Sequence, residues 1–137
     1  MLNHILQQQL NSAVNEQQVA YGPYVFKVND RVMQIKNNYD KLVFNGDIGT
    51  VVEINKGDQI LQIQFDTALV SYEFTELDEL SLAYAISIHK SQGSEYEAVI
   101  IPIFMQHFTL LQRTLLYTAV TRAKKLCIII GLSLIHI

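Results

Sequence analysis

The sequence predicts an α/β fold in which a parallel sheet segment is interrupted by a small β-barrel. Between residues 24 and 74, apolar residues recur with a period of two and turn residues separate short runs, which is typical of a small barrel. Residues 98–103 and 126–130 are apolar at nearly every position, which indicates strands of a parallel sheet covered on both faces. A helical pattern lies between these two runs.

Composition sets the class of protein. Half of the 137 residues are hydrophobic and 17% are charged, which excludes an intrinsically disordered chain. A single cysteine, Cys127, excludes an internal disulfide and a cysteine-rich zinc site, and the histidines lack metal-ligand spacing. The chain has neither a membrane-spanning apolar run nor a signal pattern. We therefore expect a cytoplasmic protein with no metal ligands of its own and no membrane partner.

The first half of the chain begins with a predicted helix over residues 2–10. Its leucines and isoleucine are spaced as one apolar face, which we expect to pack on the α/β part. Residues 11–18 are polar and predict a loop, and Gly49 is expected to mark a bulge within the barrel. The predicted barrel strands are residues 25–28, 31–36, 48–54, 59–65 and 68–74.

The second half predicts a parallel sheet with one long helix. The helix covers residues 110–125, with Thr109 as its N-cap and Gln112 completing a capping box. Lys124 and Lys125 then fall in the last turn, where the helix dipole favours cations. The predicted strands of this sheet are residues 82–88, 98–103 and 126–130.

Charge is divided unevenly along the chain. Residues 1–79 hold five Lys and Arg against eleven Asp and Glu, a balance of −6, whereas residues 80–137 have a balance of +3. This asymmetry favours anion binding in the C-terminal part. Unevenly placed solvating charge explains it equally well.

One polar segment follows the strand predicted over residues 82–88. Ser87, His89, Lys90 and Ser91 are residue types that hold phosphate oxygens, and they stand at the carboxyl end of that strand, where α/β sheets bind ligands. Gly93 permits a backbone conformation or a close approach that a side chain would block. The alternative is that these residues form an ordinary solvated turn.

A second segment ends the predicted long helix. An arginine leaving a rigid helix, such as Arg122, can stabilise a transferring phosphoryl group, because it stays charged and offers a planar fork of donors. The alternative is a surface charge that compensates the helix dipole. Cys127, in an apolar strand, is expected to be a core residue rather than a nucleophile.

In this order and spacing the two segments resemble motifs V and VI of superfamily-one DNA helicases of the RecD/TraA type, the exodeoxyribonuclease V alpha-subunit family. Residues 84–95 resemble motif V and residues 116–123 resemble motif VI. Residues 22–54 resemble the SH3-like insertion of that family, and residues 2–7 resemble the segment before it. The resemblance covers residues 1–131.

The resemblance implies a domain organisation. Residues 1–22 and 80–131 would form a partial RecA-like parallel sheet, the second (C-terminal) motor domain, and residues 23–79 the inserted SH3-like β-barrel. Residues 132–137 are expected to be a non-native tail, since they look like translated adapter sequence. The reading frame is then expected to be a truncated piece of a longer gene.

The resemblance also assigns site residues. Arg122 would be the arginine finger on the ATP γ-phosphate. The residues that contact the nucleotide would be Gln92, Gly93 and Glu95. Those that contact single-stranded DNA would be Ser87, His89 and Lys90. Tyr117 and Thr121 would support Arg122. Asn38 and Tyr39 are weaker candidates for contacting a base or sugar, and packing on the barrel rim is as good an explanation of Tyr39.

The sequence contains no phosphate-binding Gly-x-x-x-x-Gly-Lys-Ser/Thr loop and no apolar strand ending in Asp-Glu. The resemblance implies that ATP and Mg²⁺ serve the intact parent protein, with Mg²⁺ held by an N-terminal motor half. The parent is expected to be an ATP-dependent 5′-to-3′ DNA helicase of recombination and repair, and this piece alone to be inactive as an ATPase. Expected partners are single-stranded DNA, the N-terminal motor domain of the same polypeptide and RecBC-like subunits.

Two other functions stay open. One is a freestanding nucleic-acid-binding or protein-binding module built on the β-barrel. The other is a non-helicase P-loop relative, such as a nuclease-linked ATPase, that shares the second motor half.

Overall fold

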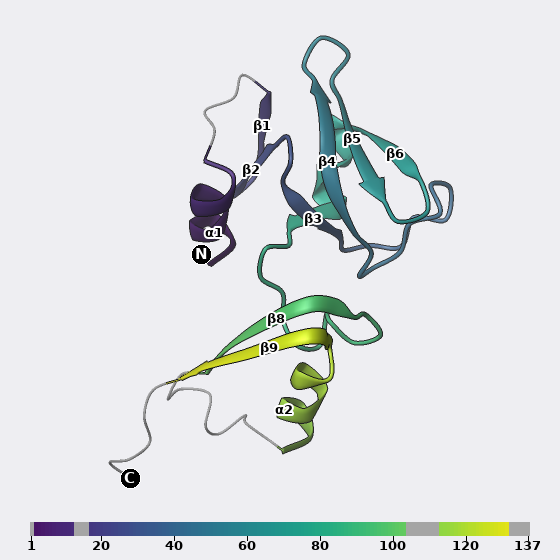
Figure 1. Cartoon of the computed structure of the whole chain (residues 1–137). Helices are drawn as coiled ribbons and strands as arrows, with labels where there is room; N and C mark the ends of the chain where they lie inside the picture. The colour runs from purple at the N-terminus through teal and green to yellow at the C-terminus, as the bar shows by residue number, and fades with distance from the viewer. Residues whose placement is uncertain (1, 13–16, 104–112, 132–137) are drawn as a thin grey trace. The chain divides into compact units, whose positions relative to one another are not determined.

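The computed structural model of the chain describes residues 2–12, 17–103 and 113–131 (Figure 1). The chain forms two compact units, Met1–Ala85 and Ile86–Ile137. The predicted helix N-cap at Thr109 and the predicted tail lie outside the described residues. The domain boundaries expected from the resemblance remain a prediction.

The first unit is an antiparallel β-structure preceded by a helix. Five strands form one sheet in the order β6-β5-β4-β3-β7, and β1 and β2 form a separate antiparallel pair (Figure 1). The elements are α1 (Leu2–Leu10), β1 (Gln18–Tyr21), β2 (Tyr24–Lys27), β3 (Arg31–Gln34), β4 (Ile48–Asn55), β5 (Ile60–Phe65), β6 (Leu69–Glu73), the 3₁₀ helix η1 (Phe74–Glu79) and β7 (Leu80–Leu82). The five predicted barrel strands are all present, whereas β1, η1 and β7 were not predicted as such.

The core of this unit follows from the period-two pattern. In β5, Leu61, Ile63 and Phe65 are buried, whereas the glutamines between them are not. Burying one such side chain contributes about 1.5–3 kcal/mol. The pattern that predicted the strand therefore also fixes which face of it packs inward.

Gly49 does not mark a bulge, contrary to the prediction. The register between β4 and β5 shifts between Val51 and Glu53 instead. At Gly49 a Cβ atom would lie 2.6 Å from Cγ2 of Ile63 and 2.8 Å from the carbonyl oxygen of Gln64. Glycine is needed here because the neighbouring strand lies too close for any side chain.

The strand predicted over residues 82–88 is wrong. Only its first residue, Leu82, belongs to a strand, and this strand (β7) pairs antiparallel with β3 in the sheet of the first unit. Beyond it, the side chain of Asn3 hydrogen-bonds the carbonyl oxygens of Leu82 and Ala85 and accepts the Ala85 N–H. A side chain thus satisfies backbone groups that a neighbouring strand would otherwise satisfy.

Helix α1 is confirmed over Leu2–Leu10, but its buried side is not the predicted one. Leu2 and Leu10 are 49% and 70% exposed, and the buried residue is Gln7. The Gln7 amide donates hydrogen bonds to the Val25 carbonyl oxygen and to the buried carboxylate of Asp30. Polar partners inside the first unit therefore determine how this helix packs.

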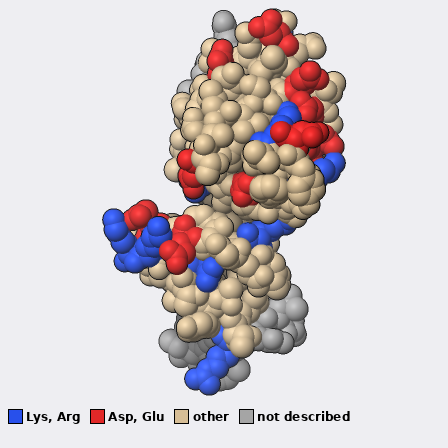
Figure 2. Space-filling view, turned by 90° about the vertical axis from the view of Figure 1, so that its right-hand side faces the viewer, with Lys and Arg blue, Asp and Glu red and all other residues tan. Residues whose placement is uncertain are grey.

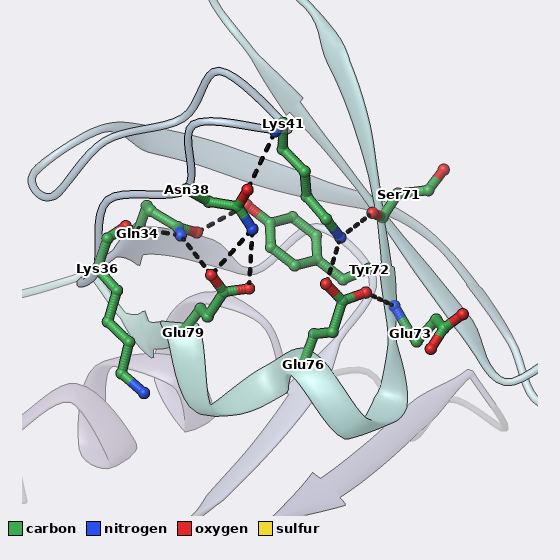
Figure 3. A network of polar contacts seen from close by, with 9 residues as sticks. All are labelled: Gln34, Lys36, Asn38, Lys41, Ser71, Tyr72, Glu73, Glu76 and Glu79. Carbon is green, nitrogen blue, oxygen red and sulfur yellow. Dashed lines mark hydrogen bonds and ion pairs between the residues drawn. The ribbon is translucent and has the colours of Figure 1, made fainter.

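A second polar network holds η1 against the sheet (Figure 3). The Tyr72 hydroxyl donates to Oε1 of Gln34 at 2.7 Å, and both side chains are buried. Lys41 Nζ lies 2.8 Å from Oε2 of Glu76 and 4.4 Å from the centre of the Tyr72 ring. Burial raises the pKa of the Tyr72 hydroxyl, which favours its protonated, hydrogen-bond-donating form.

The second unit confirms the predicted parallel sheet on a small scale. Strands β8 (Tyr96–Ile103) and β9 (Ala123–Gly131) are parallel, and α2 (Arg113–Val120) is the described helix between them (Figure 1). Several apolar side chains of the pair are exposed, including those of Ile100, Ile129 and Ile130. Both edges of this two-stranded sheet are free of further strands among the described residues.

The helix ends earlier than predicted. It stops at Val120, and Lys124 and Lys125 belong to β9 rather than to a last helical turn. The Tyr96 N–H donates to the Arg122 carbonyl oxygen at 2.8 Å, which draws the chain into the parallel sheet directly after the helix.

Candidate functional site

A compact turn over residues 87–94 carries most of the predicted site residues. The Ser87 hydroxyl accepts the Lys90 N–H at 3.3 Å, and the Ser87 carbonyl oxygen accepts the Ser91 N–H at 3.1 Å. The Ser94 N–H then donates to the carbonyl oxygen of Ser91 at 3.1 Å. The turn therefore holds its own shape through short-range hydrogen bonds.

Two residues shape the inside of this turn. Ser91 is buried, and its hydroxyl donates to the Ile88 carbonyl oxygen at 2.6 Å. Gly93 has a φ of +81°, and no atom of the described residues lies within 4 Å of the position that a Cβ atom would take. The glycine is thus required for its backbone conformation and not for a close approach.

The outer side of the turn presents polar groups to solvent. His89, Lys90, Gln92 and Glu95 are all exposed. His89 and Gln92 thus present polar nitrogen atoms to solvent on this side of the turn. The Ser87 hydroxyl is exposed too, although one of its lone pairs already accepts the Lys90 N–H.

Arg122 is brought against the end of this turn. Its Nη1 donates to the carbonyl oxygen of Ser94 at 3.2 Å, while its main chain bonds Ala119 and Tyr96. The side chain is half-buried, and its Nε is buried with no hydrogen-bond partner in the described part of the chain. A buried unpaired donor on a cation marks a place where an acceptor is expected.

The two predicted supporting residues lie on α2 and in the turn after it. The Thr121 hydroxyl donates to the carbonyl oxygens of Tyr117 and Thr118, so it closes the end of the helix just before Arg122. The Tyr117 side chain is 71% exposed. Thr121 directly precedes Arg122, and the Tyr117 carbonyl oxygen accepts both the Thr121 hydroxyl and the Thr121 N–H.

The surface charge differs between the two units in the same way as the net charge differs between the two halves of the sequence. In Figure 2 acidic side chains predominate on the first unit and basic ones on the second. On the second unit, Lys125 pairs with Glu97 at 2.9 Å with both side chains largely exposed, so the pair contributes little to stability. An anion is therefore better accommodated by the second unit.

Tyr39 is 71% exposed, and its ring meets Phe44 edge-on with the ring centres 5.7 Å apart. Its role as a contact for a base or sugar remains a prediction. The Asn38 side chain is part of the fold's own hydrogen-bond network, because its amide donates to both carboxylate oxygens of Glu79.

Sequence reasoning missed Ser94 and Tyr96, which hold Arg122 in place. Both act through main-chain atoms, so no residue-type signal could have identified them. Among the described residues no three His, Cys, Asp or Glu side chains come together as metal ligands would. The described helices include none of the length and apolar character that crossing a bilayer requires.

Comparisons with known proteins follow the same division of the chain. Residues 2–65 match the family described as the ATP-dependent RecD-like DNA helicase SH3 domain, and residues 82–130 match the UvrD-like helicase C-terminal domain. The ATP-dependent RecD2 DNA helicase of Deinococcus radiodurans is 36% identical over 123 residues, which are 90% of this chain and 17% of that protein. The RecBCD enzyme subunit RecD of Buchnera aphidicola is 39% identical over 100 residues, covering 69% of this chain and 16% of that subunit.

Two solved structures share the fold. A Bacteroides Pif1 helicase in complex with ADP-AlF3 and single-stranded DNA superposes with a TM-score of 0.68 at 20% identity, over 98% of this chain and 38% of that one. The Pif1 helicase of Candida albicans gives a TM-score of 0.60 at 19% identity, over 93% of this chain and 42% of that one. The chain spans less than a fifth of the length of the RecD2 helicase of Deinococcus radiodurans and of the RecD subunit of Buchnera aphidicola.

Proposed function

Because the chain belongs to the RecD-like family of superfamily-one DNA helicases, we propose that it forms the C-terminal motor half of an ATP-dependent 5′-to-3′ DNA helicase. The first motor half, which would carry the phosphate-binding loop and hold Mg²⁺, lies outside this sequence. The piece described here then hydrolyses no ATP by itself.

The observation that carries this proposal is the position of Arg122. The Arg122 side chain is half-buried, one of its nitrogens bonds the turn of residues 87–94, and its buried Nε has no hydrogen-bond partner among the described residues. In the intact protein Arg122 meets the γ-phosphate of ATP bound by the first half and stabilises charge in the transition state. The bond to Ser94 orients the guanidinium before the nucleotide arrives.

In this proposal, different residues of the turn contact two different ligands, the nucleotide and the DNA. Gln92, Gly93 and Glu95 face the nucleotide, and the exposed His89 and Lys90 contact the phosphates of single-stranded DNA. Ser87 both shapes the turn through Lys90 and offers its hydroxyl to the strand. Thr121 and Tyr117 support Arg122 by fixing the end of α2.

The partners follow from the relatives. RecD is named as a subunit of the RecBCD enzyme in several of them, so RecBC-like subunits and a role in recombination and repair in the cytoplasm belong to the same proposal. Single-stranded DNA and the first motor half of the same polypeptide are its direct partners.

Replacing Arg122 in the full-length gene product tests the catalytic role. In Arg122→Ala the ATPase kcat falls by roughly 10³-fold, because the transition-state cation is lost. Arg122→Lys retains only a small part of the ATPase rate, since the point charge of lysine cannot replace the planar donor fork of arginine. Arg113→Ala, an exposed arginine at the start of α2, keeps the ATPase rate and is the matched control.

Two results would contradict the proposal. One is a kcat of Arg122→Ala within about twofold of the unchanged protein. The other is metal-dependent ATPase activity of the purified 137-residue chain that survives Arg122→Ala.

DNA binding is tested on this chain with a fluorescent oligothymidylate and anisotropy at two salt concentrations. The double variant His89→Ala, Lys90→Ala weakens binding and flattens its salt dependence, because a phosphate contact is lost. Lys56→Ala, in the exposed turn between β4 and β5, removes equal charge elsewhere and serves as the control. Equal affinity and equal salt dependence of the double variant and the control would remove the turn from the DNA path.

A further inference from the structure

The loop between β3 and β4, residues 35–47, presents large apolar side chains to solvent. Tyr39 and Leu42 are 71% and 72% exposed, and Phe44 is 40% exposed. The Tyr39 and Phe44 rings also contact each other edge-on. Single exposed apolar residues are ordinary on a protein surface, whereas a concentration of them in one short loop marks an interaction site. We call these three residues the loop patch.

The loop that carries the patch is held in one shape by hydrogen bonds. The main chains of Asn38 and Val43 bond each other in both directions, at 2.7 Å and 3.2 Å. Oδ1 of Asn38 accepts the Lys41 N–H at 3.0 Å, and Oδ2 of Asp47 accepts the Phe44 N–H at 2.9 Å. Val43 is itself buried in the core of the first unit. A partner that binds here therefore has little loop ordering to offset.

Side chains also fasten the loop to the rest of the first unit (Figure 3). The Asn38 amide donates to both carboxylate oxygens of Glu79. Lys41 Nζ lies 2.8 Å from Oε2 of Glu76 and donates to the carbonyl oxygen of Ser71 at 2.7 Å. These bonds join the loop to η1 and to β6, so the loop is a fixed part of the fold.

Leu42 is kept in an unfavourable backbone conformation. Its φ is +56°, in the left-handed region that residues with a side chain rarely adopt. The side chain is nevertheless 72% exposed, so the fold gains little from its packing. A strained residue whose side chain points to solvent is typical of a position kept for function.

Charge decides which kind of partner fits the patch. The loop and η1 together hold five carboxylates against two lysines. Both lysines already face a carboxylate, Lys36 that of Asp78 at 2.7 Å and Lys41 that of Glu76. Asp40, next to Tyr39 in the chain, is exposed and has no ion-pair partner among the described residues. This surroundings of the patch repels phosphate and attracts a cation.

We propose that the loop patch docks a segment of a partner protein that presents an arginine beside an apolar side chain. The guanidinium stacks on the exposed Tyr39 ring and bonds the Asp40 carboxylate, because arginine is both planar and charged. The apolar side chain of the partner packs on the remaining apolar residues of the patch. Nucleic acid is the less favoured occupant, since its phosphates meet carboxylates here.

The first test selects random peptides displayed on phage for binding to the full 137-residue chain. We expect the enriched sequences to contain an arginine next to an aromatic or aliphatic residue. A fluorescent copy of the most enriched peptide is then titrated with the chain, and its anisotropy gives the affinity. Enriched sequences that lack arginine, or no enrichment at all, would overturn the proposal.

Variants of the patch locate the binding site of that peptide. Tyr39→Ala and Leu42→Ala weaken binding about five- to thirtyfold, as expected for the truncation of an interface anchor. Leu10→Ala, at a 70% exposed leucine on α1, is the matched control. Asp40→Asn also weakens binding, whereas Asp66→Asn, at an exposed residue between β5 and β6, does not. Patch variants that bind the peptide as tightly as their controls contradict the assignment.

Leu42→Gly separates binding from folding. Glycine adopts the left-handed conformation readily, so the urea midpoint stays at or above that of the unchanged chain while the peptide is bound more weakly. Unchanged peptide affinity of this variant would remove Leu42 from the docking surface and overturn the proposal. Oligothymidylate is the probe for the other class of partner. If Tyr39→Ala binds it more weakly than Leu10→Ala does, the occupant is nucleic acid and the protein partner is excluded.

Discussion

The Tyr72 hydroxyl lies 2.7 Å from Oε1 of Gln34, and both side chains are buried within the first unit. Gln34 in turn donates to the Lys36 carbonyl oxygen at 2.8 Å. A glutamine buried in a sheet is stable only while its oxygen has a donor. The bond therefore joins β6 to β3 across the core through polar atoms.

Removing this donor is expected to destabilise the barrel. Tyr72→Phe leaves Oε1 of Gln34 without a partner and lowers the free energy of unfolding by about 1–3 kcal/mol, measured by urea denaturation. Tyr39→Phe, at a 71% exposed tyrosine, changes it little and is the control. Equal stability of the two variants would contradict the importance of the bond.

The close strand approach at Gly49 gives a second prediction. Gly49→Ala places a methyl group 2.8 Å from the Gln64 carbonyl oxygen, which cannot move without disturbing the sheet. We expect a loss of about 1–3 kcal/mol in the free energy of unfolding. Gly57→Ala meets only the Asn55 side-chain oxygen, at 3.3 Å, and costs little. A Gly49→Ala protein as stable as Gly57→Ala would show that the strands can separate at no cost.

Acid should weaken the contact between η1 and the sheet. Burial raises the pKa of the Glu76 carboxyl, but the hydrogen bonds from Lys41 and from the Glu73 N–H outweigh it, so the pKa lies below its usual value. A carboxyl with a lowered pKa stabilises the fold at pH above its ordinary pKa and loses that contribution as the pH falls through the lowered one.

The measurement is the urea midpoint between pH 7 and pH 3. Glu76→Gln is expected to lose less stability than the unchanged chain over this range, because it has no such carboxylate to protonate. Glu53→Gln, at an exposed residue of β4, is expected to behave like the unchanged chain. The same acid response in Glu76→Gln and in the unchanged chain would refute this explanation.

The turn of the candidate site makes a fourth prediction. Because Gly93 has a φ of +81°, Gly93→Ala strains the backbone, whereas Gly93→Asn is tolerated better. We expect Gly93→Ala to weaken binding of oligothymidylate more than Gly93→Asn does. An identical affinity for both variants would mean that the turn conformation has no part in binding.

The sequence predicts best where one physical signal dominates. The strand β5 was predicted from its alternation because each alternate residue is buried in a single core. The parallel pair β8 and β9 was predicted from unbroken apolar runs. In these places local pattern and tertiary structure agree.

It predicts worst where a side chain replaces a backbone partner. The segment after Leu82 looked like a strand because it is apolar, but Asn3, which lies far away in the sequence, takes its hydrogen bonds. The same holds for α1, whose apolar face gave no indication that Gln7 would be the buried residue. Such contacts depend on tertiary neighbours that periodicity does not encode.

The bare parallel pair has a practical consequence. Ile129 and Ile130 are 50% and 57% exposed on a strand whose outer edge has no neighbour among the described residues. Unpaired edges of this kind recruit strands from other molecules, so concentrated solutions of the isolated polypeptide are expected to aggregate on warming. A charged gatekeeper on that edge, as in Ile129→Lys, is the change to make before crystallisation or spectroscopy is attempted.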